Sequence, residues 1–400
     1  MHKSSSFNSL LSGEGLQSRW RQTSANSFIR RKSRFRFHFV YLIAAILLIL
    51  IIYVSLPSTK KGFSSTYVET TPAICSNPIS YNYTYPLTRP IVNTHNHHTI
   101  YRIAIIADLD TNSKKNQAQS SYSSYIKKGY LTVGPSQSTF EFKWDAEGST
   151  EITSGFALKG RGMELSELVT FNGRILTFDD RTGIVYELIN DKVVPWVIVT
   201  DGETISAKGF KSEWATVKNN QLFVGSMGKE WTNGAGDFEN YNPMMVKVIS
   251  VNGEVKTLNW VKNFKALRTT LNIEWPGYMI FEAAVWSEHH KKWFFLPRRC
   301  SSQKYNETLD ESRACNYLIT ADDAFAKIEV TKVGELKPTK GYSSFKFLPS
   351  SHDNIIVALK TEELNGSTST YVTVFDIKGT IIMEDEKIQT EYKYEGFEFV

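Results

Sequence analysis

Six acidic or hydroxyl residues share one place in the sequence pattern, because each stands just ahead of a short apolar run that is typical of a strand. Strands that lined a common axis would bring these oxygen atoms to one point. Carboxylates that converge without basic partners repel one another strongly, and a bound cation would remove this repulsion. Ca²⁺ suits several carboxylate and hydroxyl oxygens. The predicted metal-site residues are Ser166, Glu167, Glu213, Glu282, Ser343 and Glu395.

Asp108 and Asp110 form a further acidic pair at the end of the apolar run Arg102–Ala107. Side chains alternate along a strand, so both carboxylates would point to the same side. They are candidates for holding a metal ion or its water molecules. A turn at the end of a strand is the alternative explanation for both residues.

A repeated hairpin unit must position these residues, and it is most complete in Gly160–Leu188. There, two alternating apolar runs flank Asn172-Gly173, which is the strongest short signal for a β-hairpin. Similar units follow at spacings of tens of residues, which indicates a propeller. Pairing Arg102–Ala107 with the C-terminal segment Gly396–Val400 would complete a fifth unit. We therefore predict an all-β, five-bladed β-propeller that is closed by its N- and C-terminal strands.

The formal net charge of +5 arises largely before residue 40. Residues 1–38 are rich in Ser and Arg and poor in acids, and we predict a basic cytoplasmic tail rather than a nucleic-acid arm, because an apolar run follows. Residues 39–56 carry no charge and would span about 27 Å as a helix, enough for a transmembrane signal anchor. A cleaved signal peptide is the alternative, but the tail is long and no A-x-A site follows. The positive-inside rule then places the stem, 57–100, and the propeller, 101–400, outside the cytosol.

Three glycosylation sequons agree with a luminal or extracellular body, at Asn82, Asn306 and Asn365. In an oxidising compartment, Cys300 and Cys315 could close a short disulfide loop. Cys75, in the stem, either stays free or pairs with a second chain, which would give a homodimer. A catalytic thiol is disfavoured, because no His lies in a recognisable motif with any cysteine.

Ordered sequence blocks from about residue 100 to the C-terminus resemble the calcium-activated nucleotidase family, the apyrase type of blood-feeding arthropods and of the vertebrate secretory pathway. So many blocks in the same order exclude chance agreement. Residues 1–99 are similar only in forming an anchor and stem. Among the matching blocks are RIAIIADLDT (102–111), KGRGMELSEL (159–168), DDRTGIVYEL (179–188), KGFKSEWATVK (208–218), WFFLPRR (293–299), GYSSFKF (341–347) and YEGFEF (394–399).

The resemblance implies a five-bladed propeller with one Ca²⁺ in its central tunnel that hydrolyses nucleoside di- and triphosphates. It assigns the metal to the same six positions as the repeat pattern, although the family commonly has Asp where this chain has Glu167. Phosphate transfer needs cations around the polyphosphate and an oriented water. The phosphate-binding candidates are Arg181, Lys229, Arg298 and Arg299, with Trp231 to stack on a base and Asp108, Asp110 and Asp180 to orient the water.

Other nucleotide-binding machinery is missing, because the chain has neither a P-loop nor a complete dinucleotide fingerprint. We therefore predict a Ca²⁺-dependent apyrase acting on UDP, GDP and ADP or on triphosphates. The alternative is a non-catalytic propeller that binds a glycan or protein, with calcium in a structural role. Residence in the endoplasmic reticulum or Golgi would suit removal of UDP, and residence at the cell surface would suit clearance of ATP and ADP.

Overall fold

The computed structural model describes residues 39, 41–49, 80–116 and 119–400. The chain divides into two units, Met1–Asn77 and Pro78–Val400. In the first unit, residue 39 and residues 41–49 are helical. Among the described residues, no helix has both the length and the apolar character needed to cross a membrane. The predicted tail, most of the predicted anchor and Cys75 lie outside the described residues.

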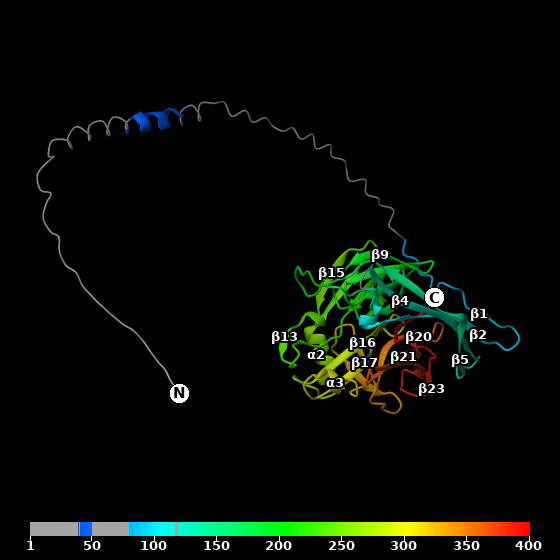
Figure 1. Ribbon diagram of the computed structural model, residues 1–400. Coiled ribbons are helices and arrows are strands. Elements are labelled where there is room, and N and C mark those ends of the chain that lie inside the picture. Colours follow the sequence, from blue (N-terminus) through cyan, green and yellow to red (C-terminus); the bar gives the residue numbers. More distant parts are fainter. Residues whose placement is uncertain (1–38, 40, 50–79, 117–118) are drawn as a thin grey trace, which may run out of the picture. The chain divides into compact units, whose positions relative to one another are not determined.

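The second unit contains five larger antiparallel sheets and one two-stranded ribbon, and the five larger sheets are those that the repeated hairpins predict (Figure 1). Four of the sheets are four-stranded meanders whose strands pair in chain order. The first contains β6 (Leu165–Phe171), β7 (Arg174–Asp179), β8 (Ile184–Ile189) and β9 (Lys192–Ile198). The second contains β10 (Trp214–Lys218), β11 (Gln221–Gly225), β14 (Met245–Ile249) and β15 (Val255–Asn259). The third contains β16 (Tyr278–Ser287), β17 (Lys292–Ser301), β18 (Tyr317–Asp322) and β19 (Ile328–Lys332). The fourth contains β20 (Lys340–Phe347), β21 (Ile355–Leu364), β22 (Ser367–Asp376) and β23 (Ile381–Lys387).

The fifth sheet is built from both ends of the described unit and confirms the predicted ring closure. Its innermost strand is β24 (Tyr394–Phe399), which pairs with β2 (Thr99–Ala107) in antiparallel register, for example Ile105 with Phe397. Strand β2 in turn pairs with β4 (Gln119–Val133), and β4 pairs with β5 (Phe140–Ser154). Short strands β1 (Ile91–Val92) and β3 (Lys114–Asn116) extend this sheet. The unit is therefore a five-bladed propeller.

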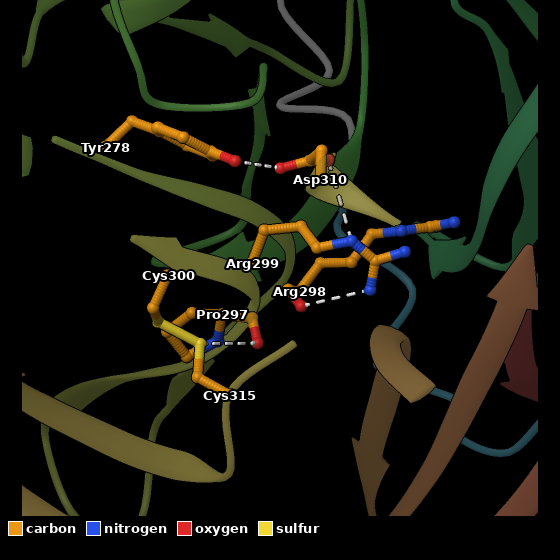
Figure 2. Close-up of a disulfide and its surroundings, with 7 residues drawn as sticks. All are labelled: Tyr278, Pro297, Arg298, Arg299, Cys300, Asp310 and Cys315. Atoms are coloured by element: carbon orange, nitrogen blue, oxygen red, sulfur yellow. Dashed lines mark hydrogen bonds and ion pairs between the residues drawn. A yellow bond between two sulfur atoms is a disulfide. The ribbon is translucent and has the colours of Figure 1, made fainter. Parts of the chain in front are cut away.

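Short elements connect the blades or lie on them. The two-stranded ribbon and the short helices are β12 (Trp231–Thr232), β13 (Phe238–Asn240), η1 (Asp110–Ser113), η2 (Asn242–Met244), α2 (Val261–Thr269) and α3 (Glu307–Asp310). The predicted hairpin turn at Asn172-Gly173 is present, with φ of 51° and 76°, as a type I′ turn requires. The predicted disulfide joins Cys300 to Cys315, with Cα atoms 5.7 Å apart, and fastens β17 to the loop before β18 (Figure 2).

The hydrophobic core lies between neighbouring blades rather than at the centre of the ring. One cluster joins Ile105 in the closing blade to Val357 in the fourth blade. Another packs Trp214, from the second blade, against Trp293, from the third. Because the apolar faces are used between blades, the axis is left for polar side chains.

The inner strands depart from regular pairing at the positions predicted to hold a metal. In β6 the register shifts between Leu165 and Leu168, in β16 between Phe281 and Ala283, and in β20 between Tyr342 and Ser344. The pairing of β24 with β2 skips Glu395. A β-bulge leaves a residue unpaired and re-aims its side chain. These irregularities therefore release Ser166, Glu167, Glu282, Ser343 and Glu395 from the regular ladder.

The part of the predicted stem that is described, from residue 80, lies against the propeller. Tyr81 packs edge-on against Phe171, and the Tyr85 hydroxyl donates to Oε1 of Glu398 over 2.9 Å. With the C-terminal ends of the inner strands, this segment lines a cavity of about 910 Å³. We refer to it as the rear cavity.

Candidate functional site

A cavity of about 1010 Å³ opens at the other end of the inner strands, and residues from all five blades line it. We call it the front cavity. The predicted residues Asp108, Asp110, Asp180, Arg181, Glu213, Lys229, Trp231, Glu282, Arg298, Arg299 and Glu395 all line it. Residues that are remote in sequence are therefore gathered at one site, as the ring model predicts.

Glu213, Glu282 and Glu395 meet cations in this cavity. Nζ of Lys211 lies 2.7 Å from Oε1 of Glu213. The Arg298 guanidinium contacts Glu282 and lies 3.0 Å from Oε1 of Glu395. The expectation that the converging carboxylates lack basic partners is therefore wrong, because Lys211 and Arg298 both reach the axis.

Burial dominates the electrostatics of Glu213 and Glu395. Desolvation raises the pKa of Glu213 to about 8, although the nearby Lys211 acts in the opposite direction. Burial also holds the pKa of Glu395 well above its usual range. Carboxylates with raised proton affinity gain most from a partner that carries more charge than a proton. The donor set of the front cavity therefore fits a divalent cation.

The other three predicted metal residues lie outside the lining of the front cavity and are buried. The carboxylate of Glu167 accepts from the Ser344 hydroxyl at 2.9 and 3.1 Å and lies 3.2 Å from Nζ of Lys346. Burial raises its pKa to about 7. Ser166 contacts the backbone oxygen of Ser212, the residue before Glu213.

Ser343 gives one indication of whether this region suits a metal ion. Its side chain is fully buried, and its Oγ has no hydrogen-bond partner among the described residues. An unpartnered buried hydroxyl is costly unless another ligand satisfies it. The serine thus fits the predicted role of a neutral oxygen ligand beside the carboxylates.

A separate acidic group stands at the wall of the front cavity. Asp108, Asp110 and Glu164 each offer an oxygen atom within 4.8 Å of the other two. Lys393 bridges the two aspartates, with Nζ 3.3 Å from Asp108 and 2.7 Å from Asp110. Arg161 donates from Nε to Glu164 over 2.7 Å. These pairings make the group a charge network in which cations and carboxylates alternate.

The two carboxylate oxygens of Asp180 have different surroundings. One oxygen contacts Lys211, while Oδ1 is buried and has no hydrogen-bond partner among the described residues. Lys211 therefore joins Asp180, in the turn after β7, to Glu213, in front of β10. A carboxylate with one free oxygen in a polar cavity can accept a hydrogen bond from a water or a substrate.

The predicted substrate residues occupy one side of the front cavity. The ring of Tyr305 lies 4.3 Å from Nζ of Lys229, and burial lowers the pKa of this lysine to about 8. Arg299 is buried, with Nε 3.5 Å from Asp310, whose other oxygen accepts from Tyr278 (Figure 2). Figure 2 shows Arg298 and Arg299 side by side after Pro297 on β17.

A family model described as Apyrase matches residues 109–400. The chain belongs to the apyrase family. An apyrase of Cimex lectularius is 47% identical over 80% of this chain and 87% of its own. The soluble calcium-activated nucleotidase 1 of Rattus norvegicus is 48% identical over 80% and 78%, and an apyrase of Phlebotomus duboscqi is 40% identical over 74% and 88%.

The range of the apyrase match includes every predicted metal and substrate residue, and among the predicted catalytic residues it leaves out Asp108. Sequence reasoning missed the cations and hydroxyls that hold the acids. A signal for two of them was present, because Lys211 and Lys393 each precede a predicted metal glutamate by two residues. In an extended segment such a spacing places both side chains on one side. The other missed contacts of the apyrase site come from Arg161, Glu164, Ser344, Lys346 and Glu363.

Proposed function

We propose that this apyrase hydrolyses nucleoside di- and triphosphates to release phosphate, in a reaction that depends on Ca²⁺. The observation that carries the proposal is the front cavity, where Glu213, Glu282 and Glu395 from three blades converge beside a row of cations. The cations of the front cavity would bind the negatively charged polyphosphate, and the carboxylates would bind a divalent metal ion. The names of the relatives, apyrase and calcium-activated nucleotidase, agree with this assignment.

Calcium would be held by Ser166, Glu167, Glu213, Glu282, Ser343 and Glu395. Bound there, it would supply a Lewis acid that neutralises charge on the phosphate oxygens. The longer arm of Glu167, where the family commonly has Asp, suits an ion with a large and loose shell.

The remaining chemistry belongs to side chains that line the front cavity. Lys229, Arg181 and Arg299 come from different blades and could contact phosphate oxygens, with arginine favouring bidentate contact. Asp180 would orient the attacking water, and the lack of a hydrogen-bond partner for its Oδ1 among the described residues supports this role. Trp231 lines the same cavity and would stack on the base. Catalysis would rest on positioning and charge neutralisation, as phosphoryl transfer requires.

Arg298 would act differently from the other cations. Its guanidinium contacts Glu282, Glu395 and Glu363, so its hydrogen-bonding capacity is largely used by carboxylates. We infer that it holds two of the metal glutamates in place and has little hydrogen-bonding capacity left for the substrate.

The test measures phosphate release from UDP, GDP and ADP with calcium and, separately, with magnesium. We expect release with calcium, and loss of release in Glu213→Gln and Glu282→Gln with the fold intact. Glu288→Gln, which changes an exposed carboxylate at the rear cavity, is the matched control and should keep full activity. Full activity in both cavity variants would contradict the shared site. A clean, folded protein that releases no phosphate from any nucleotide would instead favour a propeller that binds a glycan or protein.

We also propose that the chain is a single-pass type II membrane protein with its propeller in the secretory lumen or at the cell surface. The disulfide between Cys300 and Cys315 supports an oxidising compartment. The apolar run 39–56 supports an anchor. Protease protection of a tagged chain in sealed microsomes tests the orientation, and microscopy tests the compartment. A homodimer through Cys75 would migrate as a doubled mass in electrophoresis without reductant.

A further inference from the structure

Two glycosylation sequons lie at the rim of the front cavity, although they are far apart in sequence. Asn306 stands between Tyr305 and Glu307, and both of these neighbours line the cavity. Asn365 stands between two further lining residues, Leu364 and Gly366. Each asparagine is itself exposed.

The local structure leaves both side chains suited to modification. Asn306 caps helix α3, and its Oδ1 accepts from the backbone N–H of Leu309 over 3.0 Å, so the amide nitrogen is not the atom used in the cap. Asn365 has φ of 52° in the two-residue turn between β21 and β22. The backbone N–H of Asn365 lies 3.4 Å from Oε2 of Glu311, just after α3. The two sequons therefore belong to one stretch of the rim.

We propose that Asn306 and Asn365 both carry N-linked glycans, which together screen one side of the front cavity and restrict the enzyme to small, freely diffusing nucleotides. In each modification, Nδ2 forms a bond to C1 of the first sugar as the bond from C1 to a lipid diphosphate breaks. The amide loses one proton to a base of the glycosylating enzyme, and the lipid diphosphate leaves with the electron pair of the broken C1–O bond. The size restriction rests on the proposed function, whereas the presence of the glycans does not.

The physical reason for a screen is steric. An N-linked glycan is bulky and hydrated and lies on the protein surface. At this rim it would occupy the space through which a nucleotide attached to a large carrier would have to approach. A free nucleoside diphosphate would pass beside it, because the front cavity is open to solvent and far larger than a phosphate chain.

The third sequon provides a matched control within the same chain. Asn82 lines the rear cavity, at the opposite end of the inner strands, and its backbone N–H donates to Oδ1 of Asn172. A glycan there would be equally bulky but could not obstruct the front cavity. Thr308→Ala, Ser367→Ala and Thr84→Ala each remove one sequon and keep the asparagine, so the cap at Asn306 and the turn at Asn365 are preserved.

The experiment uses the full chain expressed in a glycosylating cell. Intact mass is measured for the wild type, the three single variants and the Thr308→Ala/Ser367→Ala double variant. Hydrolysis is measured with free UDP and with UDP linked through its base to a soluble dextran. We expect each single variant to lose one glycan mass. The double variant should gain several-fold in activity on dextran-linked UDP, with no change on free UDP, while Thr84→Ala changes neither rate.

Unmodified Asn306 or Asn365 in the wild type would overturn the assignment of the sites. Equal activity of the wild type and the double variant on dextran-linked UDP would overturn the screen. Enzymatic removal of the glycans from folded wild-type protein gives the same comparison without a substitution. If neither the wild type nor any variant hydrolyses free UDP, GDP or ADP, the proposed function fails, while the masses still decide whether the two sites are modified.

Discussion

Lys211 offers the sharpest test of the front cavity, because it joins two acids from different blades. Its Nζ contacts Asp180 and lies 2.7 Å from Glu213, and its side chain is 21% exposed. The substitution Lys211→Met keeps the length of the side chain and removes the charge. Asp180 and Glu213 are then left in a buried site with one cation fewer.

The expected cost depends on calcium. Removing one partner of a buried ion pair destabilises a protein by about 3–5 kcal/mol, and the partial exposure of Lys211 favours about 3 kcal/mol. A divalent ion bound to Glu213 would neutralise part of the charge left behind. The loss in free energy of unfolding should therefore be smaller with saturating calcium than without it. By thermodynamic linkage, each ~1.4 kcal/mol of unfolding free energy that calcium restores to the variant corresponds to a tenfold higher calcium affinity of the variant than of the wild type.

The assay is denaturant unfolding of wild type and variant in excess chelator and in saturating calcium, with calcium affinity measured by calorimetry. Lys218→Met is the matched control. Lys218 is also buried and lies 3.1 Å from Asp323, but it does not line the front cavity. Its substitution should cost the same free energy in both conditions. An equal loss for Lys211→Met in both conditions, with unchanged calcium affinity, would refute the shared role of Glu213 in binding the lysine and the ion.

Three further predictions concern Glu213, the disulfide and the hydrogen bond between Tyr85 and Glu398. Burial raises the pKa of Glu213 to about 8, above its unfolded value. This group should therefore stabilise the metal-free protein at low pH and lose that contribution as the pH rises from about 4.5 to about 8. Calcium affinity, measured by titration, should increase over the same pH range. Replacing Cys300 and Cys315 by Ser opens a loop with a sequence separation of 15, which should lower the free energy of unfolding by about 3 kcal/mol in denaturant titrations. Tyr85→Phe removes the hydrogen bond to buried Glu398 and should lower the free energy of unfolding by about 1–3 kcal/mol in the same titrations, with phosphate release unchanged. A loss of phosphate release would contradict this and show that the rear cavity is coupled to the front cavity.

Much of the fold was predictable because its signals are local. The turn at Asn172-Gly173 needs positive φ at both residues, and few other residue pairs accept this geometry. Each further hairpin repeats the same short pattern, so the number of blades could be counted along the chain. Ring closure was also predictable, because Arg102–Ala107 and Gly396–Val400 were the strands left without a neighbour, and β2 does pair with β24.

The charge network was harder to predict, because it depends on where side chains from different blades point. Arg298 looked like a phosphate ligand from its position in β17, yet it contacts Glu282 on the neighbouring strand and Glu395 from the closing blade. Sequence periodicity carries no information on such contacts between blades. Lys211 and Lys393 were the exceptions, since their spacing from Glu213 and Glu395 lies within one extended segment.

The position of Glu395 connects the chemistry to the stability of the whole ring. This residue lies on β24, the strand that closes the propeller by pairing with β2. An ion held jointly by Glu395, Glu213 and Glu282 would link the closing blade to two others at the axis. Since such a ligand set exists only in the closed ring, binding would favour closure by mass action. Calcium would therefore act on this fold in the way a disulfide acts on a loop, and a variant weakened in the pairing of β24 should regain stability when calcium is added.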